Sequence, residues 1–194
     1  MKNIYLLSNL TKTSVSRRLD SVSLPSRCRV MPIILLFLTA FSLHAWGASY
    51  TITFNGTVSE STSITTSTTA ASITGSSSYV TGNVAAANKA YGATGDGIKL
   101  GTSSNAGSIT INLSTSGQVT PTSIVANCKL YKSTKPATLS VNGATAKNVT
   151  ADFDDLTFDI TTAITSISLR SSKYIWVKSI TVNYSGSCTD PTTP

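Results

Sequence analysis

Apolar and polar residues alternate along several short stretches of this chain, and turn-forming residues separate one stretch from the next. Side chains of a β-strand point to opposite faces in turn, so this alternation predicts strands with one buried face. In residues 108–113, for example, Ile109, Ile111 and Leu113 fall on the same face. The other stretches that predict strands are 50–54, 123–131, 138–141, 156–160 and 174–184.

Other parts of the chain carry weaker patterns. Residues 57–78 are rich in Ser and Thr and predict a loop with weak or edge strands, and residues 83–91 predict one helical turn or a loop. Ile164, Ile167 and Leu169 mark another strand, in which a one-residue bulge has to correct the alternation.

Short strands with turn residues between them, such as Asn142-Gly143, predict an all-β fold, either a β-sandwich or a β-barrel. Helical periodicity over ten residues is not found beyond position 48, which disfavours a parallel α/β sheet. Only 12% of the residues are charged, against roughly a quarter in an average protein. Thr and Ser take much of that share, and β-branched Thr suits a pleated surface.

An uncharged apolar run over residues 31–43 follows Arg27 and Arg29 and precedes Ala45 and Gly47. Basic residues, a short apolar run and small residues in this order predict a secretory signal peptide that is cut after Gly47. A retained membrane anchor is the alternative, but the run is shorter than the roughly 18–20 residues that span a bilayer.

This pattern predicts a secreted or cell-surface protein that meets the membrane only during export. Residues 1–47 are then the leader, 48–184 a single β-sandwich domain and 185–194 a linker or C-terminal stub. Which residue starts the chain stays open, because a start at Met31 would remove the two arginines. Whether the chain is truncated at its C-terminus also stays open.

The formal net charge of +7 belongs mostly to the leader. Six of the 15 basic residues, but only one of the eight acidic ones, precede residue 48. The remaining chain is nearly neutral and shows no basic stripe, so we do not expect it to bind nucleic acid.

Of the three cysteines, Cys28 lies in the leader, and Cys128 and Cys188 lie in the remaining chain. One disulfide between the last two is possible in an exported protein. The alternative, which we favour, is that Cys128 is a small buried apolar residue and Cys188 a free thiol.

The residues for common catalytic chemistry are scarce. The only histidine is His44, in the leader, which excludes a Ser-His-Asp triad or a Cys-His pair from the remaining chain. A pair of carboxylates, Asp152 and Asp154, is the one option left for a glycosidase. Together with Asp155 they are also weak candidates for metal ligands. The alternative is that these aspartates only make a turn soluble. We therefore expect no enzyme and no cofactor.

Several stretches resemble the jelly-roll, galactose-binding-like β-sandwich modules at the front of many secreted Bacteroidetes proteins of uncertain function. The similarity lies in GDGIKLGTSSNAGSITINL, the SVNG hairpin, DFDDLTFDI with TSISLRSS, YIWVKSITVNY and YTITF. The resemblance implies two facing antiparallel sheets and, commonly, carbohydrate recognition. Relatives that hold a structural calcium ion carry acidic residues before the last strand. Lys178 stands near that place here and offers no oxygen ligand, which argues against the calcium ion.

Aromatic rings stack on the apolar face of a sugar ring, and polar side chains then bind its hydroxyl groups. Tyr131, Tyr174 and Trp176 are candidates for such a platform, with Asn127, Arg170 and Lys173 as polar neighbours. The alternative is that the rings, Trp176 above all, pack in the core. The sequence thus predicts a non-catalytic, carbohydrate-binding module whose partner is a glycan or another surface polymer. A structural spacer or protein-interaction domain is the alternative.

Overall fold

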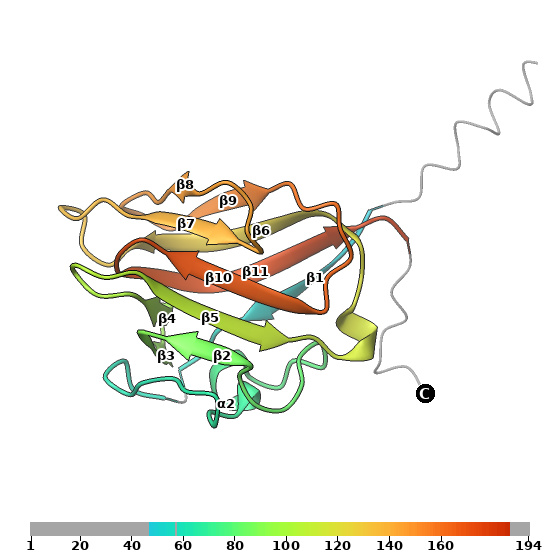
Figure 1. Ribbon diagram of the computed structural model, residues 1–194, viewed down its shortest axis with the longest axis horizontal. Coiled ribbons are helices and arrows are strands. Elements are labelled where there is room, and N and C mark those ends of the chain that lie inside the picture. The colour runs from blue at the N-terminus through green and yellow to red at the C-terminus, as the bar shows by residue number, and fades with distance from the viewer. Residues whose placement is uncertain (1–46, 57, 187–194) are drawn as a thin grey trace, which may run out of the picture. The chain divides into compact units, whose positions relative to one another are not determined.

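The computed structural model describes residues 47–56 and 58–186. Two antiparallel sheets face each other, with the five-stranded sheet in front of the six-stranded one in Figure 1. The predicted all-β fold, a two-layer β-sandwich, is therefore confirmed. The predicted leader, apart from Gly47, and residues 187–194 lie outside the described residues. Within the described part of the chain, no helix is long and apolar enough to cross a membrane.

The six-stranded sheet has the order β3-β4-β11-β6-β9, and β1 also pairs with β11. Its strands are β1 (Ala48–Thr53), β3 (Ala90–Thr94), β4 (Gly97–Leu100), β6 (Pro121–Leu130), β9 (Asp154–Phe158) and β11 (Ile175–Tyr184). On one side, β11 pairs with β6 along its length. On its other side, residues 175–177 pair with β4 and residues 179–184 pair with β1. The longest shared ladder therefore runs through the last strand.

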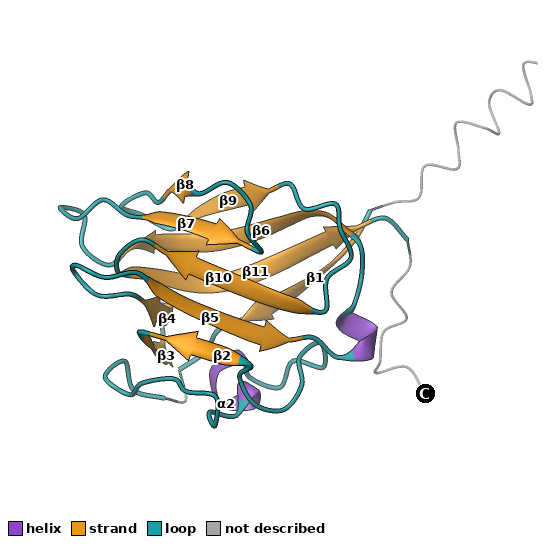
Figure 2. Cartoon of the chain, viewed as in Figure 1, coloured by secondary structure: helices purple, strands orange, loops and turns teal. Residues whose placement is uncertain are grey.

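The five-stranded sheet has the order β2-β5-β10-β7-β8. Its strands are β2 (Ala86–Asn88), β5 (Gly107–Asn112), β7 (Thr138–Val141), β8 (Lys147–Asn148) and β10 (Ser166–Ser171). The described chain also contains a short α-helix, α2 (Ala70–Thr74), and a 3-10 turn, η1 (Thr115–Gly117), both purple in Figure 2.

The sandwich core consists of the inward side chains of both sheets, and it follows the alternation seen in the sequence. In β9 and the residues after it, Phe158 and Ile160 are buried, whereas Asp155, Thr157 and Asp159 are exposed, as predicted. Ile109, Ile111 and Leu113 are all buried. Every buried side-chain polar atom of the described residues has a hydrogen-bond partner, so the apolar interior contains no uncompensated polar group.

One expectation for the first half of the chain needs correction. Residues 83–91, expected to form a helical turn or a loop, contain β2 and the start of β3 instead. The described part of 57–78 is mostly loop with isolated bridges at Ser63 and Thr69, as expected, and it also contains the helix α2. Further along, Ile164 is buried in an isolated bridge with Val119 rather than within β10, so no bulge is needed before Ile167.

Candidate functional site

An aromatic and basic cluster covers one end of the outer face of the six-stranded sheet. Trp176 on β11 is in register with Lys99 on β4 and with Lys129 on β6. Their neighbours Ile175, Leu100 and Leu130 pair in the same way and belong to the core. Because adjacent residues of a strand point to opposite faces, Trp176 and the two lysines point outward, away from the sandwich interior.

Three rings pack together on this outer face. The ring of Tyr131 lies 5.5 Å from that of Trp176 and 4.8 Å, edge-on, from that of Tyr174, measured between centroids. Trp176 is 5% exposed and Tyr174 is 7% exposed, whereas Tyr131 is half-buried. Tyr131 is therefore the outer ring of the cluster, and the other two rings support it. The three aromatic residues that the sequence singled out are brought together.

A surface cavity of about 350 Å³ lies beside this cluster. We call it the aromatic pocket. Its volume falls at the lower end of the range for small-molecule sites, about 300–1,000 Å³. Its lining residues come from β3, β4, the loops that follow β4 and β6, and the turn before β11: Tyr91, Lys99, Gly101, Thr102, Ser103, Tyr131, Lys132 and Tyr174.

Lys99 stands between two of the rings that line the aromatic pocket. Its Nζ lies 4.6 Å from the ring centroid of Tyr91 and 5.3 Å from that of Tyr131. Each such cation–π contact contributes about 0.5–1 kcal/mol at an exposed site. The contacts therefore hold the ammonium group at the pocket. The described lining includes no carboxylate that would neutralise it.

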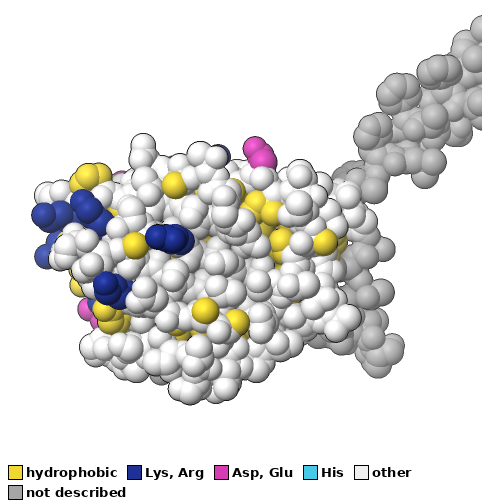
Figure 3. Space-filling view, viewed as in Figure 1, with side chains coloured by type: hydrophobic (Ala, Val, Ile, Leu, Met, Phe, Trp, Pro, Cys, Tyr) yellow, Lys and Arg dark blue, Asp and Glu magenta, His cyan; other side chains and the backbone are white. Residues whose placement is uncertain are grey.

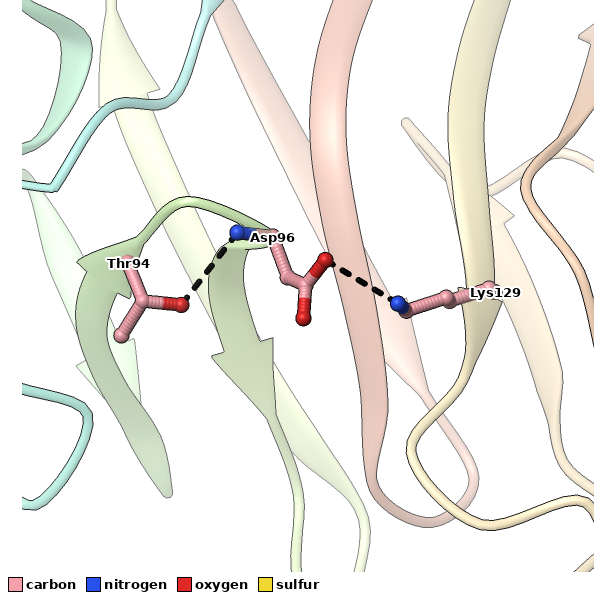
Figure 4. Close-up of polar contacts among 3 residues, drawn as sticks. All are labelled: Thr94, Asp96 and Lys129. Atoms are coloured by element: carbon pink, nitrogen blue, oxygen red, sulfur yellow. Dashed lines mark hydrogen bonds and ion pairs between the residues drawn. The ribbon is translucent and has the colours of Figure 1, made fainter.

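A second basic group lies further along the same face. Lys129 Nζ forms an ion pair with Asp96 Oδ1 at 3.0 Å. The backbone N–H of Asp96 donates a hydrogen bond to the Thr94 hydroxyl oxygen at 3.3 Å (Figure 4). Lys129 Nζ also lies 4.5 Å from the ring centroid of Phe153, and Lys178 Nζ lies 5.4 Å from it. Lys129 is thus held by its carboxylate partner, unlike Lys99.

The basic side chains are unevenly distributed. On the face drawn in Figure 3, most Lys and Arg side chains gather toward the end at the left, where Figure 1 places the loops between β4 and β5 and between β6 and β7. Those two loops contribute Thr102, Ser103 and Lys132 to the aromatic pocket. On the face drawn in Figure 3, the basic side chains thus gather at the end of the sandwich that carries these two loops.

The structure separates Arg170 from the aromatic platform. Arg170 lies on β10 between the buried Leu169 and Ser171, so it points to the outer face of the five-stranded sheet. There it borders two shallow cavities of about 140 and 290 Å³. Lys173 is half-buried in the turn before β11, and its backbone approaches Gly101, which lines the aromatic pocket. Of the two basic neighbours expected for the platform, only Lys173 is near it.

The candidate metal ligands do not converge. Asp152, Asp154 and Asp155 are all exposed, and no group of three His, Cys, Asp or Glu side chains within the described residues is arranged to hold a metal ion. Asp155 Oδ1 instead accepts a hydrogen bond of 2.7 Å from Asn127 Nδ2, and Asp154 Oδ1 accepts one from the backbone N–H of Asp155. These contacts stabilise the start of an edge strand.

Cys128 is the buried apolar residue that the sequence favoured, with 1% of its surface exposed. Burial raises the pKa of its thiol to about 12, and the charges of Asp154 and Asp155 add to that effect. A thiol with this pKa carries almost no thiolate at neutral pH and is a poor nucleophile. Cys188 lies outside the described residues.

Sequence reasoning missed Tyr91, Lys99 and Lys132 as lining residues. Lys99 stands between Ile98 and Leu100 in an alternating strand, so the sequence does predict that its side chain points outward. Its neighbours across the sheet cannot be predicted from the local pattern, because they depend on the pairing of Lys99 with Trp176, 77 residues further along the chain.

The fold and the site together define a two-sheet antiparallel β-sandwich with a tyrosine-lined pocket on one outer face. No protein-family model and no curated protein sequence matches the chain. Among solved structures, it is similar to a family two carbohydrate esterase from Cellvibrio japonicus, with 10% sequence identity and a TM-score of 0.37. The similarity covers 77% of this chain and 37% of that one.

Proposed function

We propose that this chain is an exported, non-catalytic module that binds carbohydrate at the aromatic pocket, in the jelly-roll, galactose-binding-like class of sandwiches that its sequence resembles. The single observation that carries the proposal is the pocket itself. Tyr91, Tyr131 and Tyr174 line it together with the hydroxyl-bearing residues Thr102 and Ser103. Rings next to hydroxyl groups suit a sugar, which has an apolar face and a polar edge.

The support beneath Tyr131 makes this ring a suitable stacking surface. Trp176 and Tyr174 are buried and contact it from two directions. A ring that is already fixed loses little conformational entropy when a ligand binds, so more of the stacking energy contributes to affinity.

Isothermal titration of the full chain against a panel of soluble polysaccharides tests the proposal. We expect Tyr131→Ala to weaken binding at least tenfold and Tyr131→Phe to leave it within threefold, because Phe keeps the ring. Tyr79→Ala is the matched control. It removes another half-buried tyrosine, stacked 4.2 Å from Tyr50, whose strand pairs with the far half of β11.

Thermal unfolding of each variant establishes that it is folded. If no polysaccharide in the panel binds, or if Tyr131→Ala binds as the wild type does, the proposal is wrong. A structural spacer or protein-interaction domain then becomes the better account.

The non-catalytic part of the proposal is supported by the lack of histidine beyond His44 and by the exposure of Asp152 and Asp154. A general acid needs a sheltered carboxyl group to hold its proton near neutral pH. Prolonged incubation with a bound polysaccharide should release no reducing ends. Release that Asp154→Asn abolishes would establish a glycosidase instead.

Export is supported by the apolar run 31–43 after two arginines. N-terminal sequencing of the protein recovered outside an expressing cell should begin at Ala48. A protein that keeps the apolar run would contradict the predicted cut.

A further inference from the structure

We propose that the aromatic pocket selects acidic polysaccharides, whose sugar rings carry a carboxylate or a sulfate group. This inference rests on the proposed function and names its ligand class. It follows from the charge of the pocket, which the stacking argument does not use.

The first step concerns Lys99. Its ammonium group lies over the rings of Tyr91 and Tyr131, 4.6 and 5.3 Å from their centroids. Two cation–π contacts keep it beside the ring on which a sugar would stack. Among the described residues, the carboxylate of Asp96 pairs with Lys129, and no ion pair engages Lys99. An anionic ligand group would therefore give Lys99 an ion-pair partner.

The second step concerns the rest of the lining. Lys132 is exposed on the loop after β6 and also lines the aromatic pocket, which gives it two lysines and no carboxylate among its described residues. A neutral sugar does not need this excess of positive charge for binding. A carboxylate accepts charge-assisted hydrogen bonds from ammonium groups, and these are roughly twice as strong as neutral ones.

The third step is geometric. The carboxylate of a pyranuronate ring projects from the ring edge, so a sugar stacked on Tyr131 keeps that group free to reach sideways. Lys99 Nζ lies over the Tyr131 ring, 5.3 Å from its centroid, and over the Tyr91 ring, so the edge carboxylate of a sugar that contacts these rings comes within reach of the ammonium group. Stacking and ion pairing can therefore occur together, and each increases the residence time of the other.

Lysines beside aromatic rings also suit single-stranded nucleic acid. The described residues argue against it, because the sandwich has no extended basic groove. Beyond residue 48 the chain contains nine basic and seven acidic residues, whereas nucleic-acid affinity depends on many phosphate contacts. An acidic polysaccharide needs only the local charge.

Two matched polymer pairs test the inference by titration of the full chain. The first pair is polygalacturonate and its carboxyl-reduced form, and the second is dextran sulfate and dextran. We expect at least tenfold tighter binding of the acidic member in one pair, and the pair that responds tells carboxylate from sulfate. A 12-nucleotide single-stranded DNA serves as the third ligand, and we expect it to bind at least tenfold more weakly.

Lys99→Gln should weaken acidic-polymer binding about tenfold and neutral-polymer binding less than threefold. Lys132→Gln, at an exposed position, should also weaken acidic-polymer binding and provides the test if Lys99→Gln impairs folding. Lys147→Gln is the control, because Lys147 is exposed on β8 of the other sheet. All variants carry the same leader, so its basic residues contribute equally to each measurement.

The outcomes separate the inference from the proposed function. Equal affinity for both members of each pair, with a loss in Tyr131→Ala, overturns the acidic preference and leaves carbohydrate binding intact. Loss of affinity in Lys147→Gln as large as in Lys99→Gln overturns it in favour of general charge attraction. DNA binding as tight as that of the acidic polymer overturns it in favour of nucleic acid. Absence of binding to every polymer overturns both proposals.

Discussion

The ring of Tyr131 lies on that of Trp176, with centroids 5.5 Å apart and an angle of 35° between the planes. Trp176 is therefore buried on the outside of the sheet rather than in the sandwich core. The alternative that Trp176 packs in the interior is half right, since its surface is covered but its neighbours are surface residues. Trp176 is a positioning residue for the platform.

Replacement of Trp176 should reveal this supporting role. We expect Trp176→Ala to lower the free energy of unfolding by about 3 kcal/mol, since it removes a large buried side chain. Trp176→Phe keeps a ring beneath Tyr131 and should cost less than about 1.5 kcal/mol. Urea unfolding measures both. A loss below about 1 kcal/mol in Trp176→Ala would show that the indole contributes little packing.

Gly97 should not tolerate a side chain. Its φ is +94°, and a Cβ there would collide with the backbone carbonyl of Val177, where β4 approaches β11. We expect Gly97→Ala to destabilise the fold by about 3 kcal/mol or more, through strain and steric overlap. Gly95→Ala is the control, because a Cβ at Gly95 meets no atom within 4 Å. Similar melting temperatures for the two variants would contradict this close approach.

The ion pair between Lys129 and Asp96 should contribute little to stability. Their side chains are 25% and 47% exposed, so water and salt screen the attraction. A double-mutant cycle with Lys129→Gln and Asp96→Asn should give a coupling of about 0.2–1 kcal/mol that shrinks as salt is added. A coupling above about 2 kcal/mol that resists 1 M salt would mean that the pair is more shielded than its exposure indicates.

The buried thiol of Cys128 should make the fold sensitive to alkaline pH. Its folded-state pKa is about 12 against an ordinary value of 9.0. Below about pH 8 the thiol is protonated in both states and contributes almost no pH dependence. Above pH 9 the unfolded chain releases this proton more readily, so the free energy of unfolding falls, by about 1 kcal/mol between pH 9 and 10.

Cys128→Ala separates this effect from the lysines and tyrosines that titrate in the same range. The stability difference between wild type and variant, measured by urea unfolding at pH 7, 8 and 10, should stay constant up to about pH 8 and then shift against the wild type. A constant difference throughout would place the thiol within reach of water.

The sequence predicts those parts of the structure that depend on local alternation of apolar and polar residues. Burial alternates with a period of two in 156–160 because one face of that strand meets the core, and the printed residues carry that signal directly. Residues 83–91 misled because a run of small alanines has no contrast between faces. Their strand character comes from pairing with β5 and β4, which tertiary context supplies.

The site could be predicted only in part from the sequence, because it also depends on pairing between distant strands. Tyr174 and Trp176 are two residues apart in the stretch that predicts a strand, 174–184, so a shared face follows from the alternation. Arg170 stands only six residues before Trp176, yet the chain crosses from one sheet to the other between them. Tyr91 and Lys99 reach Tyr131 only through pairing across β4, β11 and β6, and no local pattern encodes that register.

The central place of β11 has a consequence for how the molecule acquires its shape. The first described strand, β1, pairs with a strand that is synthesised more than 120 residues later, as the pairing of Ala48 with Tyr184 shows. A nascent chain that still lacks β11 has neither the central strand of its larger sheet nor a partner for β1. The six-stranded sheet can therefore assemble only after β11 has been synthesised, so the chain cannot complete this sheet while β11 is still missing.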